Sequence, residues 1–265
     1  MRQAGHQSVI DPHAVVDPSA RLARDVTVGP FSVIGADVEI DAGTWIGPHV
    51  VIQGPTHIGR DNRIYQFGSL GERPQDKKYG DEPTRLEIGD RNTIREFVTI
   101  NRGTMQDAGL TRLGDDNWIM ASVHIAHDCM IGDRTIFANG ASLAGHVHIE
   151  DDVVLGGFAL VYQFTRLGTH SFCGFACGVN HDVPPYVTVA GYRAEPRGIN
   201  AEGLRRSDFS DEDIQAIRRA YRAIYRTNLR LEEAIEKVRE MTSEYPRLQI
   251  LADFLAAPSR NGIVR

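Results

Sequence analysis

Aliphatic residues recur at every sixth position along much of the chain. Counting in sixes from Ile10, every position reached as far as Leu70 is aliphatic. The next position is often glycine, and the position four after the aliphatic residue is small or β-branched. This pattern is typical of a parallel β-helix built from hexapeptide repeats, in which three short strands make one triangular coil and equivalent positions return every eighteen residues.

Each position of the repeat has an expected role. The aliphatic side chain points into the prism, glycine and small residues permit the corners, and each coil pairs with the coils above and below it. These features predict an all-β left-handed parallel β-helix. Between about eight and nine coils, at about 4.8 Å per strand, would make it roughly 40 Å tall.

The period slips twice and later stops. The slips cover residues 72–87 and 101–112 and predict two loops extruded from the coils. Regular spacing then runs from Leu113 to Val179 and ends at Asp182-Val-Pro-Pro, because proline cannot donate to a continuing ladder. We therefore expect a β-helix over residues 1–190 and a helical domain over residues 191–265.

The last part of the chain has helical periodicity. Ser210 and Asp213 resemble a capping box ahead of apolar residues at helical spacing. Apolar clusters that begin at Leu231 and Leu248 predict two further helices. Such helices would cover the open end of the β-helix, where unpaired strand edges otherwise invite aggregation.

Composition excludes several classes of protein. A chain of 265 residues with a net charge of −6 disfavours nucleic acid as the main partner. It has no apolar run of membrane-spanning length, and MRQAGHQSV lacks the apolar core of a signal peptide. We therefore expect a cytoplasmic protein without membrane insertion. Cys129, Cys173 and Cys177 are interpreted as buried thiols, with a metal pair at the last two as the alternative.

Four of the ten histidines lie within the stretch SVHIAHDCMIGDRTIFANGASLAGHVH at 122–148. A step of eighteen stacks Asp128 beneath His146, and His127 beneath Gly145 and then Gln163. A neighbouring carboxylate can hold an imidazole ready to accept a proton, and an exposed glycine N–H can meet an oxyanion. The alternatives are histidines that only decorate a solvent face, or three imidazoles binding zinc in a carbonic-anhydrase-like hydratase.

The chain resembles, essentially from end to end, the UDP-N-acetylglucosamine O-acyltransferases of lipid A biosynthesis. The residues that carry the resemblance are IGRDNRIYQF at 58–67, the loop at 71–96, HIAHDC at 124–129, LAGHV at 143–147, DVPPYV at 182–187 and INAEGLRR at 199–206. The resemblance implies a homotrimer with active sites between neighbouring β-helices and without a metal or cofactor. It implies transfer of an (R)-3-hydroxyacyl group from acyl carrier protein to the 3-hydroxyl of UDP-N-acetylglucosamine.

The resemblance also implies roles for individual residues. His127 matches the general base, Asp128 the residue that orients or polarises it, and Gly145 the oxyanion donor. Adjacent residues on a strand point to opposite faces, so His127 and Asp128 can act together only if the chain turns a corner there. The substrate-binding positions implied are Gln75, Asp76, Lys78, His124, His146, Gln163, Asn200, Glu202 and Arg206.

Three positions depart from the family pattern. Phe175 occupies the position of the acyl-chain ruler, where glycine admits a long chain, and predicts an acyl chain on the order of ten to twelve carbons. Tyr162 stands where the family usually has histidine, so it either trims the acyl pocket or alters contacts with the carrier or the sugar. Tyr192 stands where asparagine is common.

Arg218, Arg219 and Arg222 belong to an arginine-rich stretch that would suit an acidic carrier protein, although a solvated helix surface is the alternative. Two other functions remain open for the whole chain. One is the related N-acyltransferase that acts later in the pathway, which typically carries an N-terminal domain before its β-helix, whereas here the repeat begins by Ile10. The other is a non-catalytic paralogue that only binds acyl carrier protein or a nucleotide sugar.

Overall fold

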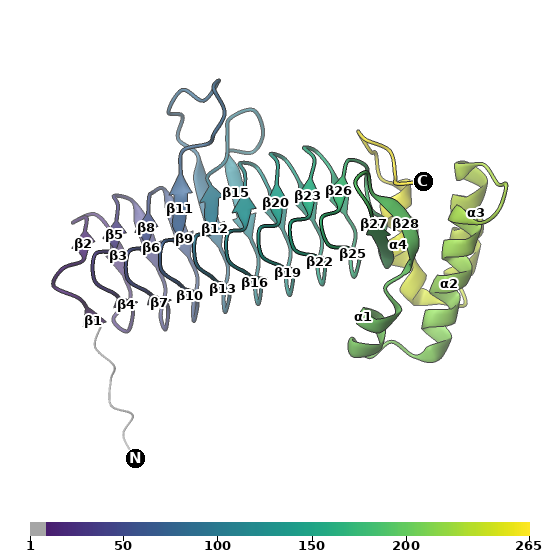
Figure 1. Cartoon of the computed structure of the whole chain (residues 1–265), viewed down its shortest axis with the longest axis horizontal. Helices are drawn as coiled ribbons and strands as arrows, with labels where there is room; N and C mark the ends of the chain where they lie inside the picture. Colours follow the sequence, from purple (N-terminus) through teal and green to yellow (C-terminus); the bar gives the residue numbers. More distant parts are fainter. Residues whose placement is uncertain (1–8) are drawn as a thin grey trace, which may run out of the picture.

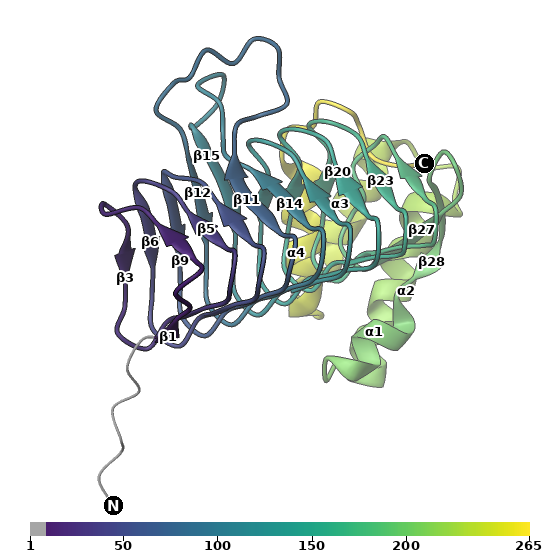
Figure 2. The ribbon, with the colours of Figure 1, turned by 60° about the vertical axis from the view of Figure 1, so that its left-hand side comes forward.

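The computed structural model describes residues 9–265. Short strands stack into three sheets that form the faces of a long triangular prism, and helices gather at one end of it (Figures 1 and 2). The hexapeptide interpretation is therefore confirmed as a parallel β-helix. Across residues 9–265, the helices lack the length and apolarity that crossing a membrane would require.

Each sheet takes every third strand of the prism. The first sheet contains β1 (Val9–Ile10), β4 (Thr27–Val28), β7 (Trp45–Ile46), β10 (Arg63–Ile64), β13 (Thr93–Ile94), β16 (Trp118–Ile119), β19 (Ile136–Phe137), β22 (Val154–Leu155), β25 (Phe172–Cys173), β27 (Val187–Ala190) and β28 (Glu195–Ile199). The second contains β2 (Val15–Val16), β5 (Val33–Ile34), β8 (Val51–Ile52), β11 (Ser69–Glu72), β14 (Thr99–Asn101), β17 (His124–Ile125), β20 (Ser142–Leu143), β23 (Leu160–Val161) and β26 (Gly178–Val179). The third contains β3 (Arg21–Leu22), β6 (Val38–Ile40), β9 (Thr56–Ile58), β12 (Arg85–Ile88), β15 (Leu110–Leu113), β18 (Met130–Ile131), β21 (His148–Ile149) and β24 (Arg166–Leu167).

The aliphatic residue of each hexapeptide points into the prism, as its period predicts. From Val28 to Val179 these side chains are no more than 4% exposed. Ile10 is 42% exposed because it lies in the first coil of residues 9–265, where β1 pairs only with β4. The three cysteines are also buried as free thiols, and burial raises the pKa of each, so they pack as small apolar groups.

The corners are formed differently from the sequence expectation. Most lie three residues after the inward aliphatic residue, and non-glycine residues there have positive φ, for example Asp128 at 59° and His146 at 61°. The glycine that directly follows the aliphatic residue permits close approach of coils instead. A Cβ on Gly29 would lie 2.8 Å from the carbonyl carbon of Gly47 in the next coil. Polar side chains are thus free to occupy the corners.

Two loops leave the prism along the edge between the second and third sheets (top of Figure 1). The first connects β11 to β12 over residues 73–84, and the second connects β14 to β15 over residues 102–109. Both are shorter than the expected 72–87 and 101–112, because Glu72 pairs with Asn101 and Arg85 with Leu110 in the ladder.

The ladder continues beyond the two prolines, so the expected stop at Asp182 is wrong. Val183 bridges to Leu167, β27 pairs in parallel with β25, and β28 pairs antiparallel with β27. Pro184 and Pro185 fall between these paired segments. The boundary expected at residue 190 therefore lies between two strands of one sheet, and the helices begin at Ala201.

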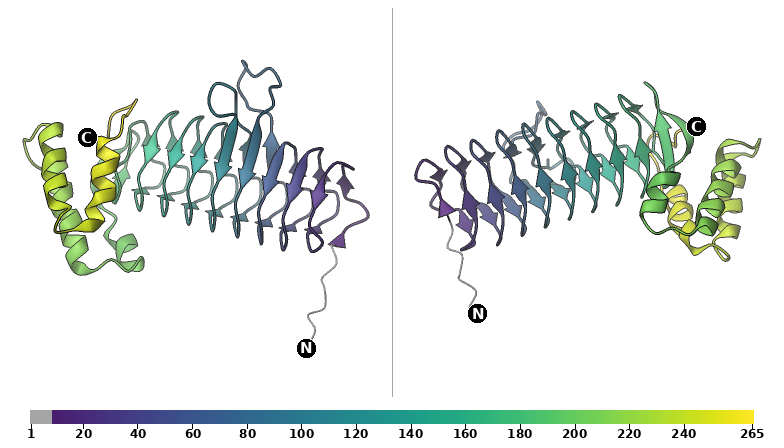
Figure 3. Two further views of the ribbon diagram at one scale, coloured as in Figure 1. Left: turned by 180° about the vertical axis from the view of Figure 1, so that it is seen from behind. Right: turned by 60° about the horizontal axis from the view of Figure 1, so that its bottom comes forward.

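The described residues form four α-helices, which pack at the end of the prism: α1 (Ala201–Arg206), α2 (Asp211–Tyr225), α3 (Leu231–Met241) and α4 (Gln249–Ala256) (Figure 3). A 3-10 turn, Pro246–Leu248, precedes α4. The Ser210 hydroxyl accepts a hydrogen bond from the Asp213 N–H at 3.0 Å, as the capping motif predicts. The six-residue α1 was not anticipated. Tyr221 of α2 joins the prism core, whereas Leu204 of α1 belongs to a separate helical core.

Candidate active site

The corner that follows β17 carries His127 and Asp128. The positive φ of Asp128 turns the chain, so that the two adjacent side chains meet instead of pointing to opposite faces. Nδ1 of His127 lies 2.8 Å from Oδ2 of Asp128. The imidazole remains 17% exposed while the carboxylate is 1% exposed. The corner required for the two groups to act together is therefore present.

Two groups of Thr104 hold the Asp128 carboxylate. The Thr104 backbone N–H donates to Oδ1 of Asp128 at 2.8 Å, and the Thr104 hydroxyl donates to Oδ2 at 2.7 Å. Burial raises the pKa of Asp128, but the hydrogen bonds from His127 and Thr104 outweigh it, and the pKa lies below its ordinary value. An ionised Asp128 accepts the Nδ1–H of His127, which leaves the Nε2 lone pair to accept a proton.

Gly145 lies beside the imidazole in the next coil. A Cβ at this position would lie 2.6 Å from Cε1 and 2.8 Å from Nε2 of His127, so any side chain would displace the ring. Within residues 9–265 the Gly145 N–H has no hydrogen-bond partner. The expected column of His127, Gly145 and Gln163 is confirmed, because β17, β20 and β23 pair in register. A backbone donor and a proton acceptor thus share one surface.

His146 occupies the neighbouring column, as the eighteen-residue spacing predicts. Its Nε2 lies 3.7 Å from Oδ2 of Asp128, and its Nδ1 lies 3.1 Å from Oδ2 of Asp107. Its ring meets the His127 ring edge-on at 5.2 Å between centroids. Nδ1 of His124 lies 2.7 Å from the Thr99 hydroxyl. Burial, aided by the nearby His127, lowers the pKa of His124, which favours a neutral ring near pH 7.

The two loops fold back onto this corner. The Gln106 side-chain amide donates to Oδ2 of Asp76 at 2.7 Å, and the Lys78 backbone N–H donates to Oδ1 at 2.9 Å. These bonds, first the one from Lys78, lower the pKa of Asp76. The side chains of Gln75 and Lys78 are exposed beside them. Thr104, Gln106 and Asp107 were not anticipated, and the only sequence signal is a polar run where the aliphatic period breaks.

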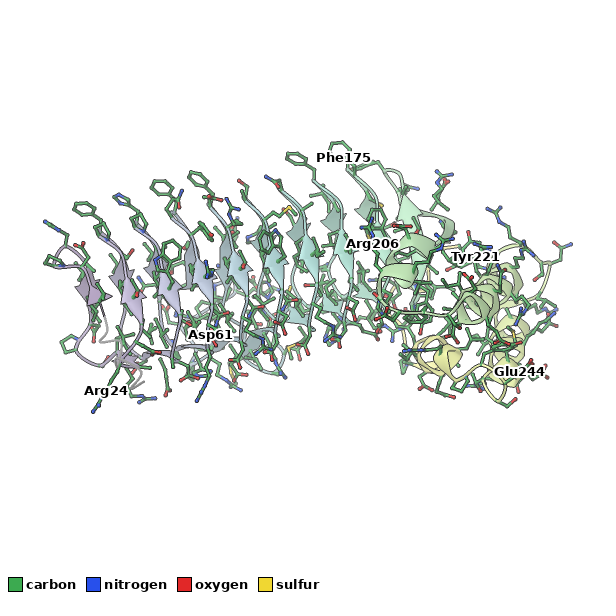
Figure 4. The ribbon with its side chains drawn as sticks, turned by 90° about the horizontal axis from the view of Figure 1, so that it is seen from below. Arg24, Asp61, Phe175, Arg206, Tyr221 and Glu244 are labelled. Atoms are coloured by element: carbon green, nitrogen blue, oxygen red, sulfur yellow. The ribbon has the colours of Figure 1, made fainter. Side chains whose placement is uncertain are left out.

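Other expected site residues lie on different edges of the same chain. Phe175 projects outward from the edge between the first and second sheets and is 74% exposed (Figure 4). Asn200 caps α1 and donates to the His170 carbonyl oxygen at 3.0 Å, at the edge between the third and first sheets. Glu202 and Arg206 form an ion pair at 3.0 Å on α1. A single chain therefore does not gather these residues around His127.

Two further groups of expected residues border cavities away from the corner. Tyr162 and Tyr192 line an apolar cavity of about 390 Å³ on the second sheet. Arg219 and Arg222 line a cavity of about 450 Å³ between α2 and α3, and the Arg219 guanidinium lies 4.8 Å from the Tyr245 ring centroid. Arg218 is half-buried outside that cavity.

One group in the described part of the chain is close enough to hold a metal ion. It consists of His127, Asp128 and His146, whose ligand atoms lie within 4.8 Å of one another. It offers two imidazoles, whereas the hydratase alternative requires three. Thr104 and His127 already engage the carboxylate. This arrangement favours proton transfer over metal binding.

The stacked coils and the histidine–aspartate corner place the chain among the hexapeptide-repeat transferases. Residues 111–145 match a family model described as bacterial transferase hexapeptide (six repeats). Residues 182–264 match the second domain of UDP-N-acetylglucosamine O-acyltransferase. The first match lies within the middle of the prism, and the second runs from the last strands through the helices.

Relatives that match over nearly the whole chain identify which family of hexapeptide-repeat transferases it resembles. The acyl-[acyl-carrier-protein]–UDP-N-acetylglucosamine O-acyltransferase of Halorhodospira halophila is 61% identical over 256 residues, 97% of this chain and 99% of that protein. The protein of the same name from Herminiimonas arsenicoxydans is 58% identical over 262 residues, 97% and 100% of the two chains. The solved structure of LpxA from Acinetobacter baumannii has a TM-score of 0.94 at 46% identity and covers 97% of this chain and 100% of that one. This chain belongs to the acyl-[acyl-carrier-protein]–UDP-N-acetylglucosamine O-acyltransferase family.

Proposed function

We propose that the protein transfers an (R)-3-hydroxyacyl chain from acyl carrier protein to the 3-hydroxyl of UDP-N-acetylglucosamine, the first step of lipid A biosynthesis. Membership of the family supports the reaction and both substrates. The observation that carries the mechanism is the 2.8 Å contact of His127 with Asp128, beside the Gly145 N–H, which has no hydrogen-bond partner among residues 9–265. We also propose that the protein acts in the cytoplasm, and the membership of this family supports that location.

General-base catalysis follows from this arrangement. Nε2 of His127 takes the proton of the sugar 3-hydroxyl as that oxygen attacks the thioester carbonyl carbon. The new C–O bond forms, negative charge collects on the carbonyl oxygen, and the Gly145 N–H donates to it. When the C–S bond breaks, the imidazolium returns the proton to the thiolate. Asp128 holds the imidazole orientation and stabilises its charged form.

A homotrimer would complete the site. Phe175, Asn200, Glu202 and Arg206 lie on other edges of the chain than His127. In a cyclic assembly one edge of each chain faces a different edge of its neighbour, so residues that are separate in one chain can meet across the boundary. We propose that these residues serve the His127 of a neighbouring copy. We also propose a left-handed winding of the coils, as the hexapeptide resemblance implies.

The proposed reaction is tested by comparing two acyl acceptors, one with a free 3-hydroxyl and one with a free amine. Purified protein is incubated with 3-hydroxyacyl carrier protein and either UDP-N-acetylglucosamine or its 3-O-acyl-glucosamine derivative with a free amine. We expect an alkali-labile ester on the first acceptor, detected by mass spectrometry. An alkali-stable amide formed only on the second acceptor would support the N-acyltransferase instead. Substrate binding without a product would support the non-catalytic paralogue.

Replacement of Phe175 by glycine should lengthen the preferred acyl chain. The ring covers Gly157, with Cδ2 3.5 Å from the position of a Cβ there, and its removal opens the space of several methylene groups. We expect the preference in a competition among 3-hydroxyacyl carrier proteins to move by about two carbons or more. Phe31→Gly removes another exposed ring from the same edge and should leave the preference unchanged. An unaltered preference in Phe175→Gly would refute the ruler role.

Charge reversal at Arg218, Arg219 and Arg222 should weaken use of the carrier-bound donor. Between residues 9 and 265, none of these three guanidinium groups has a carboxylate within ion-pair distance, so their charge is available to an acidic partner. We expect KM for the acyl carrier protein to rise about tenfold while KM for a short soluble thioester stays constant. An equal rise for both donors would show that the triple variant damages the enzyme in general.

A further inference from the structure

A third cavity lies directly beside His146, on the edge that carries the two loops. Its volume is about 520 Å³, and its walls include Asp107 of the second loop, His148, Arg166 and Arg260. Figure 1 shows the yellow C-terminal segment, which follows α4, on the same edge of the prism as the loops. The mechanism derived above gives this cavity no role, although it shares His146 with the candidate site.

Hydrogen bonds fix the C-terminal segment against the last coils. The Asn261 side-chain amide donates to the Gln163 carbonyl oxygen at 3.1 Å. The Asp182 N–H donates to the Gly262 carbonyl oxygen, and the Val264 N–H donates to the Asp182 carbonyl oxygen, both at 2.8 Å. These hydrogen bonds fix the backbone next to Arg260, which borders the cavity.

Aromatic contacts connect Arg260 to the candidate site. Its guanidinium carbon lies 4.0 Å from the ring centroid of Phe164. The Phe164 ring stacks on His146 at 4.5 Å between centroids, with 14° between the ring planes. His146 in turn contacts Asp128. The guanidinium is thereby held at one end of a stack of rings whose other end reaches the catalytic carboxylate.

Among the charged side chains around the cavity, the Arg260 guanidinium has no carboxylate partner within residues 9–265. Nε of Arg166 lies 2.8 Å from the Asp182 carboxylate, and Asp107 contacts His146. Burial lowers the pKa of His148, which favours its neutral form near pH 7. Arg260 has no carboxylate within ion-pair distance among residues 9–265. A guanidinium with free donors at the mouth of a cavity suits an oxyanion, and its planar geometry suits phosphate.

We propose that Arg260 and this cavity bind a phosphate ester of one of the substrates. The inference rests on the proposed function, in which both substrates carry such a group: the nucleotide sugar a diphosphate, and the acyl carrier a phosphodiester in its prosthetic arm. One sugar ring separates the 3-hydroxyl from the diphosphate, and the His127 and His146 rings are neighbours at 5.2 Å. A sugar hydroxyl at His127 thus leaves its diphosphate close to this cavity, so the nucleotide sugar is the source we expect.

The test measures KM for each substrate in Arg260→Gln. We expect KM for UDP-N-acetylglucosamine to rise about tenfold with kcat nearly unchanged, because a charge-assisted contact in the bound state is lost. If the donor supplies the phosphate, KM rises instead for acyl-phosphopantetheine and stays constant for acyl-pantetheine, which lacks that group. Either result supports a phosphate site, and the pair of donors identifies its source.

Unchanged KM values for all substrates would overturn the inference, as would equal rises for the donors with and without phosphate. Arg247→Gln is the matched control, because its guanidinium lies 4.5 Å from the Phe209 ring and does not line the cavity. Arg260→Lys keeps the charge and should recover part of the affinity. An active wild-type enzyme with normal Arg260→Gln kinetics refutes only this inference, whereas an inactive wild-type enzyme refutes the proposed function.

Discussion

Replacement of His127 by alanine should lower kcat about 10²- to 10⁴-fold, the range that a positioned general base contributes. The variant loses the Nε2 lone pair, while Thr104 continues to hold the Asp128 carboxylate. Because that carboxylate is 1% exposed and lies behind the lost ring, 2.8 Å from its Nδ1, it cannot reach the sugar hydroxyl in place of the imidazole. Steady-state assays with the carrier-bound donor give kcat and KM separately. KM for the nucleotide sugar should change much less than kcat.

His57→Ala provides the matched control for this experiment. His57 lies on β9 of the third sheet, with Nε2 3.3 Å from an Asp41 carboxylate oxygen, and its side chain is 46% exposed. The control therefore removes an imidazole and a carboxylate contact from the same prism without touching the candidate site. A His127→Ala enzyme with the kcat of the His57→Ala enzyme would overturn general-base catalysis by His127.

Replacement of Gly145 by alanine should cost on the order of 10²-fold in kcat, although it adds only a methyl group. The new Cβ would lie 2.6 Å from Cε1 of His127, and an ordinary carbon contact is about 3.5–4.0 Å, so the ring must retreat by roughly an ångström. That movement takes the base away from the sugar hydroxyl and places a methyl group over the oxyanion donor. The fold should tolerate the change, because the ring that moves is partly exposed and the backbone ladder is untouched.

The control for Gly145→Ala is Gly68→Ala. A Cβ on Gly68 meets its nearest atoms at 3.4 Å and beyond, which are ordinary contacts, and Gly68 lies in an earlier coil. Thermal unfolding should give similar midpoints for the two variants, while only Gly145→Ala loses activity. Full activity in Gly145→Ala would contradict the close approach of the His127 ring to the Gly145 backbone.

Much of the prism could be predicted because its period is local and repeated. An inward aliphatic residue in every hexapeptide specifies the register of each coil on the next, and the column of His127, Gly145 and Gln163 follows from that register alone. The corner conformation did not follow, because the left-handed region at Asp128 and His146 is held by coil pairing and not by glycine. The short helix α1 was missed because six residues give too little helical period, and the Asn200 cap that starts it is visible only in three dimensions.

Some residues of the candidate site could likewise be predicted from the sequence, and others could not. The histidine–aspartate pair could be predicted from the resemblance of HIAHDC at 124–129 to the family, whereas the strand pattern alone would place the two side chains on opposite faces. Thr104, Asp107 and Arg260 could not, because they come from loops and from the C-terminal segment, whose paths no period constrains. Their positions depend on single contacts with the prism, such as the bond from Asn261 to Gln163, and the sequence contains no repeated signal for a single contact.

The in-register stacking of the coils has a consequence for how relatives of this protein can diverge. Between the His127 corner and the helices, a length change that preserves the ladder must come as a whole coil, and each coil separates the two ends by about another 4.8 Å. The distance along the prism from His127 to Arg260 can therefore change only by whole coils. Finer adjustment is left to the loops at 73–84 and 102–109, which can gain or lose single residues without disturbing a coil. Insertions and deletions within the family should accordingly cluster in those two loops, or fall in multiples of one coil.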